Sequence, residues 1–353
     1  MTTPPDTAPI RNEESFDERR VTGYLRERLG DLLGDGRVEY EQFPGGAANL
    51  TYLARSPNVE LVLRRAPLGD VARGGHDMER EHRVLSRLWQ AYPKAPRAYL
   101  YCDDPDVMGK PFFVMERRRG YVIRSEWPPG VGEDPEARRG VARNLVDGLA
   151  ELHGVDPDAV GLGTLGRPEG FVSRQVEGWS RRWEAARTRA VPEMDRAAAY
   201  LAAREPEPHG VTILHNDYKL DNTMVGHSGE IIAVFDWDMS TRGDPLVDLG
   251  TLLAYWPDPG SPTYPVFAEH AVALVPYVSK REALERYATA TGRDVSDVRY
   301  YEGLALFRIA VIIEQIYARF VSGQTSDPRF ARFEPLAPLL ASSAVETLES
   351  GSG

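Results

Sequence analysis

Cysteine is nearly absent from this sequence, and long hydrophobic runs are absent altogether. Cys102 is the only cysteine in 353 residues, so no intramolecular disulfide can form and the fold does not depend on an oxidising compartment. The most apolar stretch, 304–317, is interrupted by charged residues and is shorter than the roughly 18–20 residues that span a bilayer. The N-terminal segment MTTPPDTAPIRNEES lacks the apolar core of a signal peptide. We therefore expect a soluble, cytoplasmic protein with no membrane partner.

An excess of positive charge is also missing. The chain has 42 Lys and Arg against 53 Asp and Glu, a formal net charge of -11. Binding along nucleic acid needs a basic surface that replaces the counterions of the phosphates, so we predict no nucleic-acid partner. A local basic pocket for one phosphorylated ligand stays compatible with this charge. The sequence also lacks H-E-x-x-H and Cys/His clusters for zinc, a G-x-S-x-G elbow and a G-x-x-x-x-G-K-[ST] P-loop.

The order of sequence patterns predicts an α+β fold with two parts. Residues 1–14, rich in proline, threonine and charge, are predicted to be a mobile tail. Over 15–117, helical patterns at 15–34 and 78–90 accompany five strand-like runs, at 38–43, 51–54, 60–65, 98–102 and 111–116. From 118 to 345 the pattern is mainly helical, with a β-type island at 211–235. We therefore expect a small antiparallel-sheet lobe over 15–117 and a larger helical lobe over 118–345.

Two motifs in the second part carry the clearest chemistry. His215-Asn216-Asp217-Tyr218-Lys219-Leu220-Asp221-Asn222 matches H-x-D-x-x-x-x-N, and Phe235-Asp236-Trp237-Asp238 stands where kinases have D-F-G. In that pattern Asp217 accepts the proton of a substrate hydroxyl, and Asn222 and Asp236 bind Mg²⁺. A lone Asp or Asn in a loop more often makes a turn or caps a helix. The ordered set, with each Asp after a β-type run, instead favours phosphoryl transfer, which depends on positioning and charge neutralisation.

A third motif completes a family resemblance. Gly243-Asp244-Pro245-Leu246-Val247-Asp248-Leu249 follows the other two, and together they resemble the aminoglycoside phosphotransferase/choline kinase-like family, a small-molecule branch of the protein-kinase-like fold. The resemblance runs from about Tyr40 to at least Tyr255. It implies a two-lobed fold with ATP between the lobes. ATP and Mg²⁺ are then the cofactors, and the phosphate passes to a hydroxyl group of a small molecule.

The resemblance also implies nucleotide-binding residues in the first part. The segment 43–51 resembles the loop that covers the nucleotide, with Gly45, Gly46 and Asn49 near the phosphates, although a Gly-Gly pair alone is a common hairpin turn. Strand alternation puts Val62 and Arg64 on one face, where Val62 would cover the adenine and Arg64 would reach the phosphates. Arg64 replaces the usual Lys and keeps its charge; a solvated strand charge is the alternative.

The following helix and strand supply the remaining candidates in this part. The run 80–85 resembles the family's R-E-x-x-[VL]-L helix, so Glu81 would pair with Arg64, and Glu79 is the competing choice. The segment 113–116 resembles the hinge between the lobes. Backbone groups of Met115 and Glu116 would meet the adenine edge, although Met115 fits ordinary core equally well. Arg65, on the opposite strand face, is interpreted as a solvated charge.

Four residues around the catalytic motifs receive supporting roles from the resemblance. Lys219 would contact the transferred phosphate. His215 would hold the loop by hydrogen bonds rather than act as an acid or base. Asp238 would support the metal or orient its loop, and Asp248 would hold backbone N–H groups of the catalytic loop. For both aspartates a purely structural role stays open.

The acceptor is the least determined feature of the sequence. Residues 171–190 contain five arginines against two glutamates, which favours an anionic acceptor, although a solvated helix face is the alternative. The segments V-L-R-R, R-E-H-R-V-L and F-D-W-D resemble the family branch related to kinase domains fused to acyl-CoA dehydrogenases, which implies a hydroxyacyl-CoA. An aminoglycoside kinase and a catalytically inactive nucleotide-binding regulator are the two rival hypotheses. The sequence makes no prediction of oligomeric state.

Overall fold

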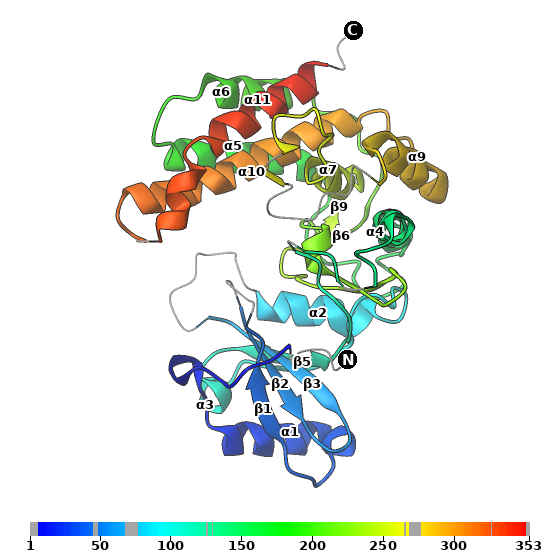
Figure 1. Ribbon diagram of the computed structural model, residues 1–353, viewed down its shortest axis with the longest axis vertical. Helices are drawn as coiled ribbons and strands as arrows, with labels where there is room; N and C mark the ends of the chain where they lie inside the picture. Colours follow the sequence, from blue (N-terminus) through cyan, green and yellow to red (C-terminus); the bar gives the residue numbers. More distant parts are fainter. Residues whose placement is uncertain are drawn as a thin grey trace. The chain divides into compact units, whose positions relative to one another are not determined.

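The computed structural model describes residues 6–44, 49–67, 77–124, 126–128, 130–264, 266–267, 277–325 and 327–350. The chain divides into two compact units (Figure 1). The first unit comprises Met1–Arg119 and Ala233–Ser240, and the second comprises Gly120–Ile232 and Thr241–Gly353. The sequence pattern does not show that residues Ala233–Ser240 belong to the first unit. This segment carries Asp236 and Asp238 into the first unit, where the Val234 N–H donates to the Lys94 carbonyl at 2.8 Å.

A five-stranded antiparallel sheet in the order β1-β2-β3-β5-β4 forms the first unit. The strands are β1 (Glu39–Gln42), β2 (Leu50–Arg55), β3 (Glu60–Arg65), β4 (Ala98–Cys102) and β5 (Phe112–Glu116). The sequence predicts all five to within one residue, because β-branched and aromatic residues stand out between polar turns. The central position of β3 sets Val62 opposite Met115 and Arg64 opposite Phe113.

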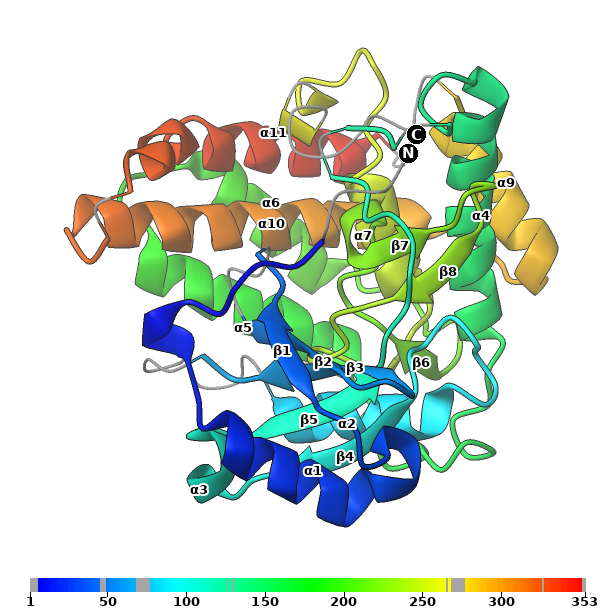
Figure 2. The same cartoon turned by 60° about the horizontal axis from the view of Figure 1, so that its bottom comes forward.

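Helices cover both faces of this sheet. α1 (Glu18–Leu33) begins after Asp17, whose carboxylate accepts two N–H groups of the first turn. α1 packs against the face that carries Tyr52 and Leu63, and α2 (Met78–Leu88) lies on the opposite face (Figures 1 and 2). The one-turn elements η1 (Asn12–Glu14) and α3 (Pro105–Met108) complete the unit. Strand alternation therefore places Val62 and Arg64 on the α2 face.

The interpretation of Arg65 as a solvated charge is wrong. Its side chain is only 1% exposed, on the α1 face of the sheet. Its guanidinium donates to the carbonyls of Met108 (2.9 Å) and Glu14 (2.6 Å) and to the Tyr52 hydroxyl. The segment before α1 covers this face and supplies carbonyl acceptors, so a charge can be buried there.

The N-terminal segment is bonded to the sheet where the structure describes it. The composition predicts a mobile tail over 1–14, whereas Ala8 forms a β-bridge with Gln42 of β1. Thr7 donates to the Glu41 carboxylate at 2.6 Å, and the Tyr52 hydroxyl donates to the Glu14 carbonyl at 2.8 Å. These bonds connect the segment to β1 and β2, and composition alone does not reveal them.

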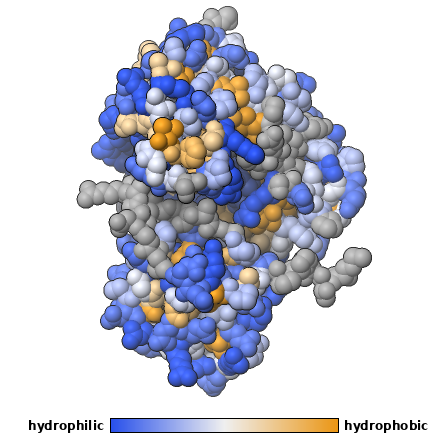
Figure 3. Space-filling view, turned by 60° about the vertical axis from the view of Figure 1, so that its left-hand side comes forward, coloured by the Kyte–Doolittle hydropathy of each residue, from blue (hydrophilic) through white to orange (hydrophobic). Residues whose placement is uncertain are grey.

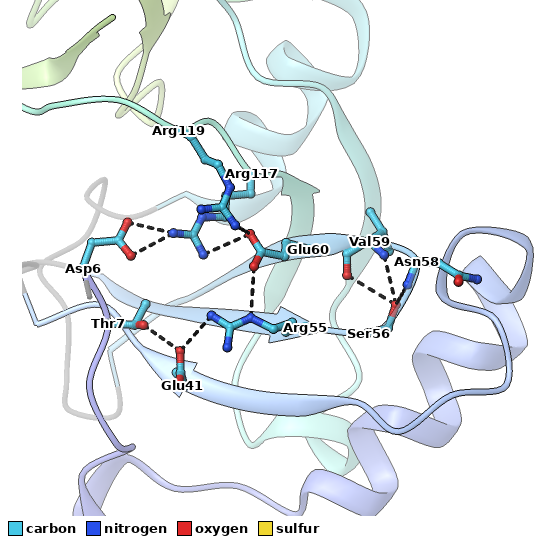
Figure 4. A network of polar contacts seen from close by, with 10 residues as sticks. All are labelled: Asp6, Thr7, Glu41, Arg55, Ser56, Asn58, Val59, Glu60, Arg117 and Arg119. Atoms are coloured by element: carbon cyan, nitrogen blue, oxygen red, sulfur yellow. Dashed lines mark hydrogen bonds and ion pairs between the residues drawn. The ribbon is translucent and has the colours of Figure 1, made fainter. Parts of the chain in front are cut away.

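Glu60, at the start of β3, forms ion pairs with three arginines (Figure 4). Arg55 lies 3.0 Å away, Arg117 3.2 Å and Arg119 2.5 Å, and Arg117 also bonds Asp6 at 2.8 Å. Partial burial opposes the charge of Glu60, but the hydrogen bond from Arg55 and the charges of Arg117 and Arg119 together lower its pKa. These ion pairs hold the segment that follows β5, with Arg117 and Arg119, against the central strand β3.

We expect Glu60→Gln to lower the free energy of unfolding by about 1 kcal/mol at neutral pH, because three arginines lose the carboxylate they share, although Arg55 and Arg117 keep Glu41 and Asp6. Urea denaturation measures this. Asp6→Asn is the matched control, since Asp6 is more exposed and is bound by one arginine only, and it should change stability by less than about 0.5 kcal/mol. Since the pKa of Glu60 is lowered, its contribution should disappear as the pH falls below about 4. Equal effects of the two substitutions would contradict the network's role.

The second unit is mainly helical, with two small strand pairs, β6 with β9 and β7 with β8. The strands are β6 (Thr212–Leu214), β7 (Thr223–Val225), β8 (Ile231–Val234) and β9 (Thr241–Gly243). The helical elements are α4 (Pro135–His153), α5 (Phe171–Ala186), α6 (Pro192–Ala203), η2 (Leu220–Asn222), α7 (Leu246–Ala254), α9 (Lys280–Thr291), α10 (Val298–Val321), η3 (Pro328–Phe333) and α11 (Leu336–Glu349). The sequence misses β9, because Thr241-Arg242-Gly243 has no run of β-branched or aromatic residues.

α10 is the central helix of the second unit. It runs beside α11 and α5 and packs closely on α7, while α4 lies beside α9 (Figure 2). Fourteen of its residues are buried, from Val298 to Glu314, and they include Arg308. The stretch that the sequence predicts to be a buried helix is therefore buried over most of its length. Its charged residues Arg308 and Glu314 are buried as well.

The surface agrees with the low hydropathy of the sequence. Figure 3 shows a mainly hydrophilic face with small, separate hydrophobic patches. No helix among the described residues is both long and apolar enough to span a membrane. The exposed large apolar side chains are few and scattered: Leu32, Val211, Met239, Ile312 and Val321.

Candidate active site

The catalytic motif occupies the loop between β6 and β7. Its second residue, Asn216, has a φ of 67°, and among the described residues Asp236 (φ 69°) is the only other non-glycine residue with positive φ. Such a backbone costs roughly 1–3 kcal/mol and persists only where its surroundings hold it. Both residues lie in the motifs that the sequence analysis singles out.

Asp248 at the start of α7 holds this loop in place. Its Oδ2 accepts the His215 N–H at 2.6 Å, and its Oδ1 accepts the Asn216 N–H at 2.7 Å. His153 lies 3.4 Å away, and Asp248 itself is fully buried. Burial opposes the charge of Asp248, but the contacts with His153 and His215 outweigh it and lower the pKa. An ionised carboxylate inside the unit therefore fixes the strained loop.

The loop presents Asp217 between two partners. Lys219 Nζ lies 2.9 Å from Asp217 Oδ2, and Asn222 Nδ2 donates both to Oδ2 and to the Asp217 carbonyl, each at 2.8 Å. The His215 imidazole accepts the Asp217 N–H at 3.3 Å. The Asp217 side chain is 26% exposed, so its carboxylate is accessible to a substrate. The side-chain hydrogen bonds of Asn222 within the described chain use only its Nδ2, which leaves its Oδ1 able to accept a cation.

Lys219 keeps its charge although it is mostly buried. Burial disfavours the ammonium, but Tyr255, Asp217 and Asp221 together raise the pKa of Lys219. Its Nζ lies 5.0 Å from the centre of the Tyr255 ring, a cation–π contact. A fixed positive charge therefore stands beside the Asp217 carboxylate.

In the first unit, Arg64 joins two carboxylates. Its Nε lies 2.9 Å from Glu81 Oε2, and its Nη2 contacts Asp236 Oδ1. The Trp237 N–H donates to Glu81 Oε1 at 3.4 Å. Glu81 is 1% exposed, and Glu79, the competing choice, is exposed on α2. The charge of Asp238 also acts on the Arg64–Glu81 pair.

Burial, together with the charges of Asp236 and Asp238, raises the pKa of Glu81 to about 7 despite Arg64. The folded protein thus binds this proton more tightly than the unfolded chain, so the contribution of Glu81 to stability falls as the pH rises through about 7. Relative to Glu81→Gln, wild-type protein should lose about 1 kcal/mol of unfolding free energy per pH unit between about pH 5 and about 7. Urea denaturation at several pH values tests this, with the exposed Glu79→Gln as control. Parallel curves for wild type and Glu81→Gln would contradict it.

The other residues predicted to bind the nucleotide lie in the sheet unit, apart from two that the structure does not describe. Val62 and Met115 are buried and paired on neighbouring strands, and Asn49 is buried before β2. Gly45 and Gly46 lie outside the described residues. The backbone N–H of Glu116 donates to the Arg97 carbonyl at 2.9 Å, and the contact of Met115 and Glu116 backbone groups with the adenine stays a prediction. The Glu116 N–H is thus used in a hydrogen bond with Arg97, the residue just before β4.

Two residues near the loop escape the sequence reasoning. His153, at the end of α4, hydrogen-bonds the Tyr287 hydroxyl at 2.6 Å and lies beside Asp248. Tyr255, which follows α7, contacts Lys219. Neither belongs to a local motif, so only tertiary contacts reveal them.

The arginines of residues 171–190 mostly have local partners. Arg182 stacks on the Trp179 ring at 4.3 Å, and Arg189 lies 3.4 Å from the buried Glu314. The other three have partners nearby in the chain: Arg174 binds the Arg167 carbonyl, seven residues earlier, while Arg181 and Arg187 pair with Glu177 and Glu184, about one turn away. These pairs favour the alternative of a helix face with local ion pairs.

A sheet unit with a buried Arg–Glu pair, joined in one chain to a helical unit with an H-x-D-x-x-x-x-N loop, is the arrangement of protein-kinase-like phosphotransferases. Fold and site therefore define that class. The chain matches the phosphotransferase enzyme family over residues 39–297 and belongs to this family.

Two curated relatives are similar to this chain over most of its length. Acyl-CoA dehydrogenase family member 10 of Mus musculus is 30% identical over 326 residues, which cover 91% of this chain and 30% of that protein. Acyl-CoA dehydrogenase family member 11 of Rattus norvegicus is 30% identical over 346 residues, 95% of this chain and 44% of that protein. The chain thus spans less than half the length of these two relatives.

Among solved structures, a "putative aminoglycoside phosphotransferase" from Ralstonia eutropha JMP134 is similar with a TM-score of 0.81 and 27% identity, covering 95% of this chain and 99% of that one. A thermostable mutant of aminoglycoside phosphotransferase APH(4)-Ia, in complex with AMP-PNP and hygromycin B, has a TM-score of 0.59 and 15% identity, with 92% and 97% of the chains covered. The expected α+β, protein-kinase-like fold is confirmed.

Proposed function

We propose that this phosphotransferase is a small-molecule kinase that moves the γ-phosphate of ATP to a hydroxyl group, with Mg²⁺ as cofactor. The observation that carries the proposal is the Asp217 carboxylate, which is accessible yet held by Lys219 and Asn222. A carboxylate so placed can orient the acceptor hydroxyl and take its proton as the phosphate bond forms. Lys219 then stabilises negative charge on the transferred group.

Asn222 and Asp236 are the proposed metal ligands. Mg²⁺ prefers oxygen ligands and is usually held by one or two protein groups together with phosphate oxygens. Asn222 Oδ1 and the Asp236 carboxylate fit this preference, since the side-chain hydrogen bonds of Asn222 to described residues use only its Nδ2 and the Asp236 side chain is 36% exposed. When bound, the metal would neutralise phosphate charge. No described cluster of three or more His, Cys, Asp or Glu side chains suggests another metal site.

Arg64, braced by Glu81, is the proposed cation for the nucleotide phosphates. Two carboxylates hold the guanidinium, so little rotamer freedom is lost when it binds an anion. We assign Gly45, Gly46 and Asn49 to the phosphates and Val62 and Met115 to the adenine. The AMP-PNP complex of APH(4)-Ia supports ATP as the donor here.

For the acceptor, we propose an anionic metabolite such as a hydroxyacyl-CoA. The likeness to members of the acyl-CoA dehydrogenase family supports this choice. The rival is an aminoglycoside acceptor, which the likeness to aminoglycoside phosphotransferases favours. An aminoglycoside is polycationic, so its site would need a lining of carboxylates.

A coupled assay of ADP release tests the proposal directly. Hydroxyacyl-CoAs, hydroxy acids, amino sugars and choline-like alcohols are offered with ATP and Mg²⁺, and Asp217→Asn serves as the inactive control. We expect release above background with anionic acceptors only. Release with aminoglycosides alone would establish the rival. Nucleotide binding without release over the whole panel would indicate a catalytically inactive regulator.

A further inference from the structure

Arg308, in the middle of α10, is a buried cation with little to balance it. Its residue is 7% exposed. Within the described chain it has no carboxylate partner within 4.0 Å, and its one hydrogen bond runs from Nη2 to Thr251 Oγ1 at 3.3 Å. Its Nε is buried without a hydrogen-bond acceptor. Burying a guanidinium in this way is costly, so a missing anion would explain it.

Arg308 lines a pocket formed by α5, α7 and α10. Gln175, Trp179 and Thr251 line it as well, and the other walls are apolar. The pocket is narrow: about 10 Å³ of it is open to the centre of a water molecule, about the room that one water needs, so the lining side chains must move apart to admit a carboxylate or phosphate. Apolar walls exclude water and strengthen any charge interaction inside.

Contacts along α7 connect this pocket with the catalytic loop. Thr251, which binds Arg308, precedes Tyr255 by one helical turn. The Tyr255 ring contacts Lys219, and Lys219 pairs with Asp217. Burial raises the pKa of the Tyr255 phenol, while Lys219 and Arg308 both act to lower it. Both cations therefore act on the Tyr255 side chain, which follows the helix that lines the pocket.

We infer that Arg308 binds an anionic oxygen group, a carboxylate or a phosphate, of the molecule whose hydroxyl Asp217 activates. The inference rests on the proposed function and narrows its acceptor. A guanidinium matches two oxygens of such a group with parallel N–H bonds. It would repel the ammonium groups of an aminoglycoside, for which the pocket lining offers no carboxylate.

Kinetics with matched acceptors test the inference. Hydroxy acids, their methyl esters and the corresponding hydroxyacyl-CoAs are compared in the ADP-release assay. Arg308→Gln should raise KM for the anionic acceptors about tenfold or more, because a charged hydrogen bond is lost. It should leave KM for the esters and for ATP nearly unchanged, and Arg308→Lys should recover part of the loss. An effect confined to free acids identifies a carboxylate, and one confined to CoA thioesters identifies a phosphate. Equal effects on esters and acids, or none, would overturn the inference.

A binding measurement separates this inference from the proposed function. Acetate, inorganic phosphate and CoA are added without nucleotide at constant ionic strength, and thermal unfolding is followed. At least one anion should stabilise the wild type and Arg319→Gln, an exposed arginine of the same helix, but not Arg308→Gln or Arg308→Met. Equal stabilisation of all variants, or of none, would overturn the anion site. Stabilisation as expected without turnover of any acceptor would instead reject the proposed kinase activity.

Discussion

Asp217→Asn should lower the rate of phosphotransfer about 10²- to 10⁴-fold, the usual contribution of a positioned general base. The amide has nearly the shape of the carboxylate but cannot take the hydroxyl proton, and Lys219 loses its charged partner. Asp248 holds the loop through backbone N–H groups of His215 and Asn216, so the substitution should leave the loop folded. The expected result is a loss of kcat with a nucleotide affinity that changes only a few-fold.

Asp221→Asn is the matched control for this prediction. Asp221 lies in the same loop, and its carboxylate is 4.0 Å from Lys219 Nζ. The Asn222 side-chain nitrogen, in contrast, donates to Asp217. Its loss should reduce kcat less than about tenfold. ADP release with an accepted substrate and nucleotide titration measure the two parameters separately. Full activity of Asp217→Asn, or a larger loss with Asp221→Asn, would remove Asp217 from the proposed role.

Gly250→Ala should lower the free energy of unfolding by about 3 kcal/mol, through overpacking between two helices. Gly250 lies in the middle of α7, against the backbone of α10. A Cβ there would lie 2.4 Å from the Tyr301 carbonyl carbon, 2.6 Å from its oxygen and 2.7 Å from the Glu302 nitrogen. Backbone atoms cannot rotate away as a side chain can, so α7 and α10 would have to separate. Urea denaturation followed by circular dichroism measures the change.

Gly140→Ala provides the opposite expectation in the same unit. Gly140 lies in α4, and no atom is within 4 Å of the position of its Cβ. Alanine there should raise stability by about 0.5–1 kcal/mol, since glycine costs that much in a helix interior. If both substitutions stabilised the protein, the close approach of α7 and α10 would be refuted.

Local chemistry explains why much of the candidate site was visible in the sequence. Asp217, Asn222 and Asp236 stand at short spacings after β-type runs, and such motifs keep their order on the chain. The five sheet strands were predicted for the same reason, because strand periodicity extends over only a few residues. Local patterns also placed Val62 and Arg64 on one face of β3.

Long-range contacts explain what the sequence could not show. The local sequence around Arg65 is typical of a solvent-exposed charge on a strand. Its burial depends on carbonyl acceptors from the segment before α1 and from Met108. His153 joins Asp248 across 95 residues of chain. The five arginines of 171–190 suggested an anionic acceptor by their number, but most of them bind local partners.

The sequence by itself determined the class of chemistry, because the order and spacing of the Asp and Asn residues in the catalytic motifs are local properties of the chain. Tertiary structure decided which charges are balanced. It pairs Arg64 with two carboxylates, whereas the partner of the Arg308 side chain among the described residues is the Thr251 hydroxyl. Burial and pairing depend on side chains that are distant in sequence, so the candidate for acceptor recognition moved from α5 to a single arginine of α10.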